Sequence, residues 1–201
     1  MTTPTVLLTG FDPFEGAAIN PSWEAARALD GATIAGHRIV SVLLPVVFGD
    51  ALDVLRRALA TTSPALAICV GVAARRELVS IERIAINLDD ARVPDNAGRQ
   101  PVDAAVVHDG PAAYFSTLPV KSILRALEAA GIPAGISESA GTYVCNHVFY
   151  GLMHALAAQP QVRGGFIHVP PLQDAAHPQG LPLATLVAGL QIAVEAALAG
   201  S

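Results

Sequence analysis

The sequence predicts a single three-layer α/β/α domain with a mostly parallel, partly mixed sheet. Short apolar runs that read as buried strands alternate along the chain with segments of helical periodicity, and this alternation is typical of a parallel sheet covered by helices. A length of 201 residues and a hydrophobic share of 52% suit one domain with a large core. We therefore expect one catalytic domain that spans residues 1–201.

The composition argues against several classes of partner. The net charge is −5 and the Lys and Arg residues are scattered, so we expect neither a nucleic acid nor an anionic membrane as partner. No uninterrupted apolar run reaches the roughly 20 residues of a membrane helix, and the N-terminus lacks the segments of a signal peptide. We expect a soluble cytoplasmic protein, in which the two cysteines stay reduced.

The first half of the chain supplies four strands and two helices. The strands are short apolar runs closed by Gly, Pro or polar turn residues. Asn20 followed by proline reads as a helix N-cap with proline at the first helical position. In order, the predicted elements are strand Thr5–Thr9, helix Pro21–Leu29, strand Arg38–Leu44, helix Asp50–Leu59, strand Leu66–Val70 and strand Ser80–Leu88.

The second half continues the alternation. From Ser139, small and hydroxyl residues suit a tight strand-to-helix turn, and the apolar spacing from Val144 to Leu156 then marks one helical face. In order, the predicted elements are helix Pro119–Ala130, strand Gly135–Glu138, a helix with Cys145 in its first turn that ends near Ala158, strand Gly164–Val169 and helix Leu183–Leu198.

Cys145 is a candidate nucleophile because of its place in the first turn of a helix. A thiol there feels the partial positive charge of unpaired backbone N–H groups, so its pKa should fall. The alternative is that Cys145 is a small buried hydrophobe, which is the usual role of a free cysteine. Cys69 lies inside an apolar strand and is interpreted as part of the core.

Glu82 is a carboxylate on an apolar strand face. Period-two alternation puts it on the same face as Ile84 and Ile86. Burying it unpaired would cost several kcal/mol, so a cationic or hydrogen-bonding partner from elsewhere in the chain is expected. The alternative is a Glu on an edge strand that pairs with Arg83 or another arginine.

Two loops stand out. The segment Gly10–Gly16 follows a strand and carries Phe11 and Phe14, which either line a ligand site at the sheet edge or close the end of the core. The polar segment Asp89–Pro101 is too long for a plain connection, and its mixture of Asp, Asn and Arg predicts a hydrogen-bonded functional loop.

Helix geometry removes two histidines as partners of Cys145. His147 lies two positions on and does not face the thiol, while His154 lies about 180° round the helix. Both share a face with Tyr150, which we interpret as a polar surface or a subunit contact.

His168 is the preferred partner. It lies near the end of a strand, at the sheet edge where the cysteine helix also begins, whereas His37 precedes a strand and His108 and His177 lie in Pro- and Gly-rich loops. A Cys–His pair needs a third group to orient the imidazole, and Glu82 already requires a partner. No metal site is expected, because neither Cys-x-x-Cys nor His-x-x-x-His spacing occurs.

With these residues assembled, the chain resembles the pyroglutamyl peptidase type I family, the pyrrolidone-carboxylate peptidases, over nearly its whole length. Six blocks in order carry the resemblance: Leu8–Gly16, Asn20–Ser22, Ile81–Asn87, Asp90–Asn96, Ser139–His147 and Gly165–Pro170.

The resemblance implies a cysteine peptidase that removes N-terminal pyroglutamate from peptides. It assigns Cys145, His168 and Glu82 as the catalytic trio and Arg92 as an oxyanion residue, beside the backbone N–H of Cys145. It also implies a cytosolic enzyme that uses no cofactor and assembles as a homotetramer. The substrate-binding residues would be Phe11, Phe14, Val72, Val93, Tyr143 and Val144.

One departure concerns Val72, which stands where many family members carry a glutamine near the substrate. The following residues, Ala73 to Arg76, also differ from the common glycine-rich version. Two other classes remain as alternatives. A related α/β enzyme such as a nucleoside phosphorylase would need a phosphate loop, and none is visible; a binding module on the same scaffold need not keep the whole trio.

Overall fold

The computed structural model describes residues 3–199, which contain nine strands. Seven of them form one sheet in the order β2-β3-β1-β4-β9-β5-β8, and the other two, β6 and β7, pair separately. The strands are β1 (Thr5–Phe11), β2 (Thr33–Ile34), β3 (His37–Leu44), β4 (Leu66–Val72), β5 (Val79–Glu82), β6 (Ile84–Ile86), β7 (Ala113–Phe115), β8 (Ala134–Ser137) and β9 (Arg163–Val169).

The large sheet is mixed. Strands β3, β1, β4 and β9 are parallel neighbours, whereas β5 runs antiparallel to β9 and parallel to β8. The short strand β2 adds an antiparallel edge beside β3. The prediction of a mostly parallel, partly mixed sheet is confirmed.

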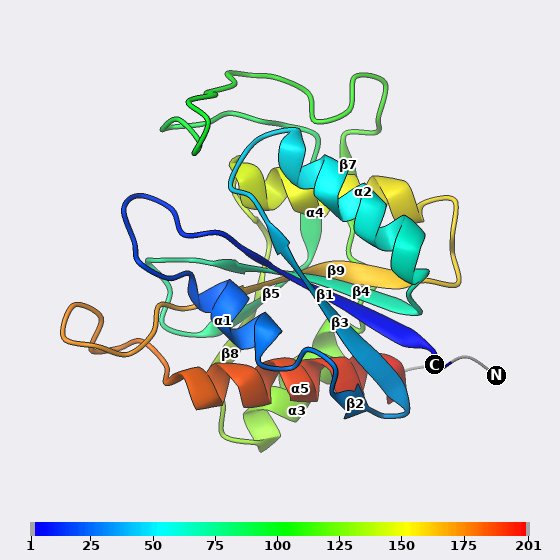
Figure 1. Ribbon diagram of the computed structural model, residues 1–201, viewed down its shortest axis with the longest axis vertical. Coiled ribbons are helices and arrows are strands. Elements are labelled where there is room, and N and C mark those ends of the chain that lie inside the picture. The colour runs from blue at the N-terminus through cyan, green and yellow to red at the C-terminus, as the bar shows by residue number, and fades with distance from the viewer. Residues whose placement is uncertain (1–2, 200–201) are drawn as a thin grey trace.

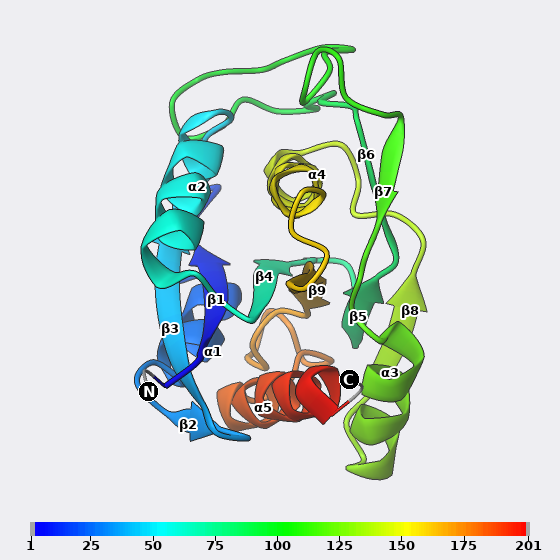
Figure 2. The ribbon, with the colours of Figure 1, turned by 90° about the vertical axis from the view of Figure 1, so that its right-hand side faces the viewer.

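Five helices within the described residues cover the two faces of this sheet (Figures 1 and 2). Helices α2 and α4 lie on one face, and α1, α3 and α5 lie on the other, which confirms the three-layer α/β/α architecture. None of them has the length and apolarity to cross a membrane. The helices are α1 (Pro21–Arg27), α2 (Asp50–Thr62), α3 (Val120–Ala129), α4 (Val144–Leu156) and α5 (Leu183–Ala199).

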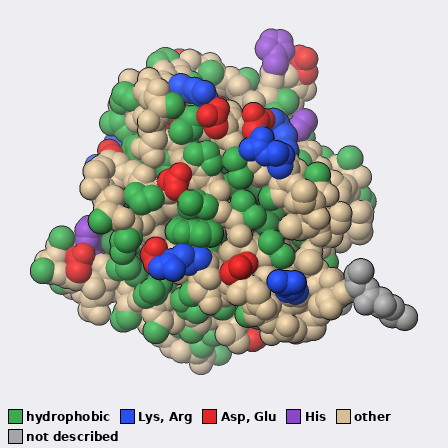
Figure 3. Space-filling model, in the orientation of Figure 1, with side chains coloured by type: hydrophobic (Ala, Val, Ile, Leu, Met, Phe, Trp, Pro, Cys, Tyr) green, Lys and Arg blue, Asp and Glu red, His purple; other side chains and the backbone are tan. Residues whose placement is uncertain are grey.

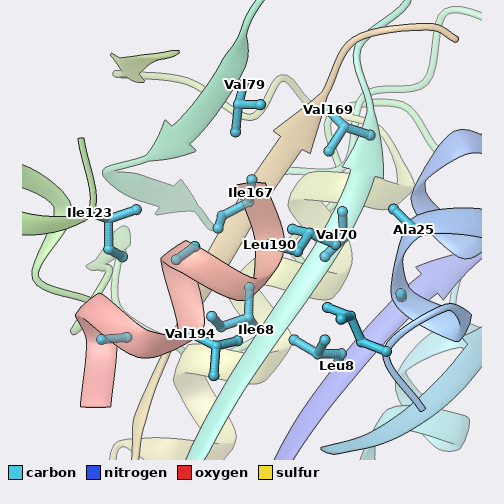
Figure 4. Close-up of a cluster of buried hydrophobic side chains, with 14 of the residues drawn as sticks. Leu8, Ala25, Ile68, Val70, Val79, Ile123, Ile167, Val169, Leu190 and Val194 are labelled. Atoms are coloured by element: carbon cyan, nitrogen blue, oxygen red, sulfur yellow. The ribbon is translucent and has the colours of Figure 1, made fainter. Parts of the chain in front are cut away.

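Alternation along the central strands divides the core between the two faces. Ile68 and Val70 of β4 point toward α5, where they belong to the same buried cluster as Leu190 and Val194 (Figure 4). The residue between them, Cys69, points the other way, into the cluster beneath α2 and α4. Side chains that face α4 therefore come from every second position of β4 and β9.

The predicted elements are found with small shifts at their ends, and three regions differ. The short strands β2 and β7 were not expected. The predicted strand Ser80–Leu88 is wrong as one unit, because the chain leaves the large sheet at Arg83. There the backbone N–H donates to Ser137 of β8 while the carbonyl accepts from Ser116, so Ile84 starts the separate β6–β7 pair.

Gly10 lies where α1 packs across the end of β1, and this close approach gives a test of the fold. A Cβ at Gly10 would lie 2.5 Å from the Cα of Trp23, a backbone atom that moves only with α1. We expect Gly10→Ala to lower the free energy of unfolding by about 1–3 kcal/mol, the usual range for overpacking, as measured by urea denaturation.

Gly135→Ala in β8 is the matched control. Its Cβ would lie 3.4 Å from a terminal methyl of Leu78, which is ordinary contact with a flexible group. Equal urea midpoints for the two variants would contradict the tight packing of α1 on β1.

Candidate active site

Cys145 is the second residue of α4, as predicted, and its sulfur lies directly over Gly71 near the end of β4. A Cβ built at Gly71 would be 2.9 Å from the Cys145 Sγ and 2.9 Å from the ring of Phe166. Any side chain at Gly71 would therefore displace the thiol. The helix start approaches the sheet this closely because β4 carries no side chain at that position.

His168 lies beside this point. In the register of β4 and β9 it is the partner of Gly71, and such partners in parallel strands project to the same face of the sheet. Its ring packs on Phe166 with 4.8 Å between ring centroids, and the residue is only 5% exposed. The imidazole is thus on the α4 face, in the same layer as the Cys145 sulfur. No hydrogen bond joins sulfur and ring within the described chain, and such bonds are often long before substrate binds.

Glu82 completes the group. It is fully buried, and its Oε1 lies 2.7 Å from the Nδ1 of His168 and 2.6 Å from an Nη1 of Arg76. Burial raises the pKa of this carboxyl, but the hydrogen bond and charge of His168, with Ser137 and Arg76, lower it by more, so the net shift is downward. An ionised Glu82 requires the proton on Nδ1 of His168, which leaves Nε2 free to act as a base.

The expectation of a partner for Glu82 is confirmed. The alternative of an edge-strand Glu paired with Arg83 or another arginine is wrong in the edge position and in Arg83, but an arginine does pair with Glu82. Strand β5 lies between β9 and β8, and Arg83 pairs with Glu138 instead. Besides His168, Glu82 has Arg76 as its partner, and Arg76 also donates to the Ser139 carbonyl at 3.0 Å. The unpaired charge expected at Glu82 was the one sequence signal for this arginine, and the residue pattern did not identify Arg76 itself.

The thiol pKa differs from the prediction. Burial, followed by the neighbouring Glu82 and Cys69, raises the pKa of Cys145 to about 12, and Arg76 lowers it only in part. The prediction of a lowered pKa from the helix start is therefore wrong, because lost hydration outweighs the partial charge of the helix terminus. A base must remove the proton as the sulfur attacks.

A cavity of about 720 Å³ opens at Cys145. Five of the six predicted substrate-binding residues line it: Phe11, Phe14, Val72, Tyr143 and Val144. The rings of Phe14 and Tyr143 pack at a centroid distance of 5.4 Å. The wall is mostly apolar. Sequence reasoning missed the parts contributed by residues 15–21 and 171–177.

Arg92 and Val93 do not line this cavity. Both are exposed, Val93 by 38%, in the loop that follows β6. The loop is hydrogen-bonded, as expected: the buried Asp95 carboxylate accepts from the N–H groups of Phe48, Ala97 and Arg99.

The interpretation of His147 and Tyr150 as a polar surface is wrong. His147 is 5% exposed, its Nδ1 lies 2.7 Å from Asp89 Oδ2, and its Nε2 accepts the N–H of Gly49 at 3.0 Å. Tyr150 is fully buried and donates to the Pro111 carbonyl. The long loop between β6 and β7 covers this face of α4, which helical periodicity alone could not reveal. Only His154 of the three is exposed.

The fold and the site together define the class of protein. A thiol at a helix start lines an apolar cavity in an α/β/α domain, and a hydrogen-bonded imidazole and buried carboxylate lie close by in the same layer. This set of groups is that of a cysteine hydrolase. Within residues 3–199, no group of three or more His, Cys, Asp or Glu side chains is placed to hold a metal ion.

Comparison with known proteins specifies the family. The sequence model described as pyroglutamyl peptidase matches residues 4–200. The pyrrolidone-carboxylate peptidase of Cupriavidus taiwanensis is 60% identical, with 97% of this chain and 93% of the relative covered. Pyroglutamyl peptidase I of Bacillus amyloliquefaciens superposes with a TM-score of 0.92 at 46% identity, covering 98% of this chain and 97% of the other.

A mutant pyrrolidone carboxyl peptidase from Pyrococcus furiosus superposes equally well, with a TM-score of 0.92 at 41% identity over 98% of this chain and 99% of the other. The chain belongs to the pyroglutamyl peptidase family of cysteine peptidases.

The raised thiol pKa gives a test of whether Cys145 is a thiol or a thiolate at neutral pH. With a pKa of about 12, the thiolate fraction of Cys145 should rise about tenfold for each pH unit across the neutral range. We expect the rate of alkylation by iodoacetamide, measured in a Cys69→Ser background, to climb without a plateau up to about pH 9.

Free N-acetylcysteine, alkylated in parallel, supplies the reference curve for an unperturbed thiol. A plateau of the Cys145 rate below about pH 8 would instead show a thiolate already formed at neutral pH, which is the state that the helix position alone predicts.

Proposed function

We propose that this protein hydrolyses the bond after an N-terminal pyroglutamyl residue of peptides, with Cys145, His168 and Glu82 as its catalytic residues. The observation that carries the proposal is the buried Glu82–His168 hydrogen bond of 2.7 Å in the same layer as a thiol that opens into an apolar cavity. The ring nitrogen that faces away from Glu82 is the one free to accept a proton.

The reaction proceeds in two halves. The Cys145 sulfur attacks the pyroglutamyl carbonyl while Nε2 of His168 takes the thiol proton, and the imidazolium then protonates the leaving amine as the C–N bond breaks. Water, deprotonated by the same nitrogen, then cleaves the thioester. Glu82 fixes the tautomer of the ring and offsets its positive charge. The chemistry needs no cofactor.

The developing oxyanion needs donors close to Cys145. The backbone N–H of Cys145 lies in the first turn of α4, where N–H groups have no partner inside the helix. Arg92 is the proposed second donor. Its loop is tied to the segment before α4, because the N–H of Asp90 donates to the Thr142 carbonyl at 3.0 Å and the Thr142 hydroxyl donates to the Asp90 carbonyl at 2.8 Å.

The ring pocket suits a lactam, which is flat and uncharged. Phe11 and Phe14 offer aromatic surface, and Val72, Tyr143 and Val144 extend the apolar wall. Val93 completes the proposed set from the exposed loop. With Val72 in place of a glutamine, the polar atoms of the lactam depend on backbone groups for hydrogen bonds.

We further propose that residues 1–201 act as one catalytic domain, that four copies assemble, and that the enzyme works in the cytoplasm without nucleic-acid or membrane partners. The resemblance to the family supports the assembly and the location, and the scattered basic residues support the absence of those partners.

The choice of nucleophile can be tested with the two cysteines. We expect Cys145→Ala and Cys145→Ser to abolish hydrolysis of a fluorogenic pyroglutamyl amide, because Cys145 and not Cys69 lines the cavity. Cys69→Ser should retain activity, since Cys69 lies fully buried in β4. Circular dichroism checks that each variant is folded. Loss of activity in a folded Cys69→Ser variant would show that the wrong cysteine was chosen.

The ring pocket can be tested by removing an aromatic side chain. We expect Phe14→Ala to lower kcat/KM for a pyroglutamyl amide by an amount equivalent to about 1–3 kcal/mol, because stacking area on the ring is lost. Phe11→Ala should act in the same direction. Phe115→Ala is the matched control, since Phe115 is 68% exposed on β7 and does not line the cavity.

Substrate choice gives the second arm of this test. A prolyl amide should be rejected by a factor of about 10⁴ or more, because its ring nitrogen is a charged amine and it lacks the carbonyl that the donors of the site require. Equal rates on prolyl, alanyl and pyroglutamyl amides would make the protein a general cysteine aminopeptidase.

A further inference from the structure

The cavity is larger than one pyroglutamyl ring requires. Its volume of about 720 Å³ is in the range that accommodates a drug-sized ligand or a short peptide. The proposed ring-binding residues account for one part of its wall. Most of the rest is built by residues 15–21, which follow β1, and residues from 171 to 177, which follow β9.

These two segments project from the same end of the molecule, as the dark blue and orange loops in Figure 1 show. Ala18 and Ile19 come from the first segment and Leu172 from the second, and all three line the cavity that also contains Cys145. Ile19 is 49% exposed, which is a large fraction for an apolar side chain. The two segments thus form apolar walls on the solvent side of the nucleophile.

The direction of the substrate follows from the reaction. Pyroglutamate is the first residue of its peptide and its nitrogen is closed in the lactam, so nothing precedes the ring. All remaining residues of the peptide lie beyond the scissile bond. Once the ring is in the pocket and its carbonyl is at Cys145, the rest of the peptide must leave along the remaining part of the cavity.

The charge of this remaining part is negative. Glu15 and Asp174 line the cavity, and among residues 3–199 no Lys or Arg does so. His177 also lines it, with its Nδ1 3.2 Å from Asp174 Oδ1. Glu15 makes no ion pair within residues 3–199. Asp174 accepts the backbone N–H groups of Ala176 and His177 at 2.8 Å and 2.7 Å, and the bond from His177 is the main cause that lowers the pKa of Asp174.

We propose that residues 15–21 and 171–177 form the subsite for the residues that follow pyroglutamate, and that Glu15 and Asp174 make it favour peptides with Lys or Arg at the third position. This proposal rests on the proposed function. The apolar walls would hold the second residue near the nucleophile, and the carboxylates at the rim would meet a basic side chain one residue further on. In Figure 3, acidic side chains and a histidine lie among hydrophobic ones at the end where these loops project.

A competition assay tests the preference. Pyroglutamyl-Ala-Lys-amide and pyroglutamyl-Ala-Glu-amide are mixed, and the ratio of their kcat/KM values is read by mass spectrometry. Charges at the rim act mainly on the rate at which enzyme and substrate meet, so we expect a kcat/KM ratio of about 3 to 10 in favour of the Lys peptide at about 0.01 M salt. The ratio should fall toward one at about 1 M salt, where the Debye length is about 3 Å.

Charge-neutral variants locate the effect. The double variant Glu15→Gln, Asp174→Asn should bring the ratio close to one, and the Asn oxygen can still accept the backbone N–H groups that hold the loop. Asp53→Asn on α2, an exposed carboxylate outside the cavity, should leave the wild-type ratio unchanged.

The outcomes separate the two proposals. Equal cleavage of both peptides by the wild type, or a Lys preference that survives in the double variant, overturns the subsite proposal while the pyroglutamyl peptidase assignment stands. If the protein cleaves neither peptide and also fails to cleave a pyroglutamyl fluorogenic amide, the proposed function is overturned, and the subsite proposal with it.

Discussion

The hydrogen bond between Glu82 and His168 is the interaction on which the site depends. A fully buried carboxylate is tolerated only when charge and hydrogen bonds meet it, and here the imidazole and Arg76 both reach Oε1. Strand β5 must therefore lie next to β9, with Glu82 opposite Phe166 and two residues from the register position of His168. The antiparallel addition of β5 and β8 at the β9 edge of the parallel strands delivers the carboxylate to the imidazole.

A second constraint places the nucleophile. Strand β8 runs in the opposite direction to β9, because it is parallel to β5 and β5 is antiparallel to β9. The C-terminal end of β8 therefore does not lead straight to the sheet edge where His168 lies, as it would in a fully parallel sheet. The segment 138–143 brings the chain to the start of α4, and Gly71 leaves room for the sulfur. The helix is held there from its far side as well, because His147 bridges Asp89 and Gly49. Sheet, helix and long loop thus fix the thiol from different directions.

Much of this could be predicted from residues alone. The apolar periods gave the layers and nearly all the elements, the helix start before Cys145 was recognisable, and the apolar setting of Glu82 indicated a paired carboxylate. What failed depended on contacts distant in sequence. The break at Arg83 requires β8 and Ser116 as hydrogen-bond partners, the burial of His147 requires the loop from β6 to β7, and the identity of Arg76 requires the register of β5. The prediction of the thiol pKa failed because a local rule for helix starts takes no account of the hydration that the thiol loses when the tertiary structure buries it.

Trapping the acyl-enzyme tests the central claim most directly. Acid quenching during turnover of a pyroglutamyl ester, followed by digestion and mass spectrometry, reports which side chain carries the acyl group. We expect a pyroglutamyl thioester on the peptide that contains Cys145. An adduct on another side chain, or hydrolysis that continues without any adduct in the Cys145→Ala variant, would contradict the assignment of Cys145, His168 and Glu82 as the catalytic group.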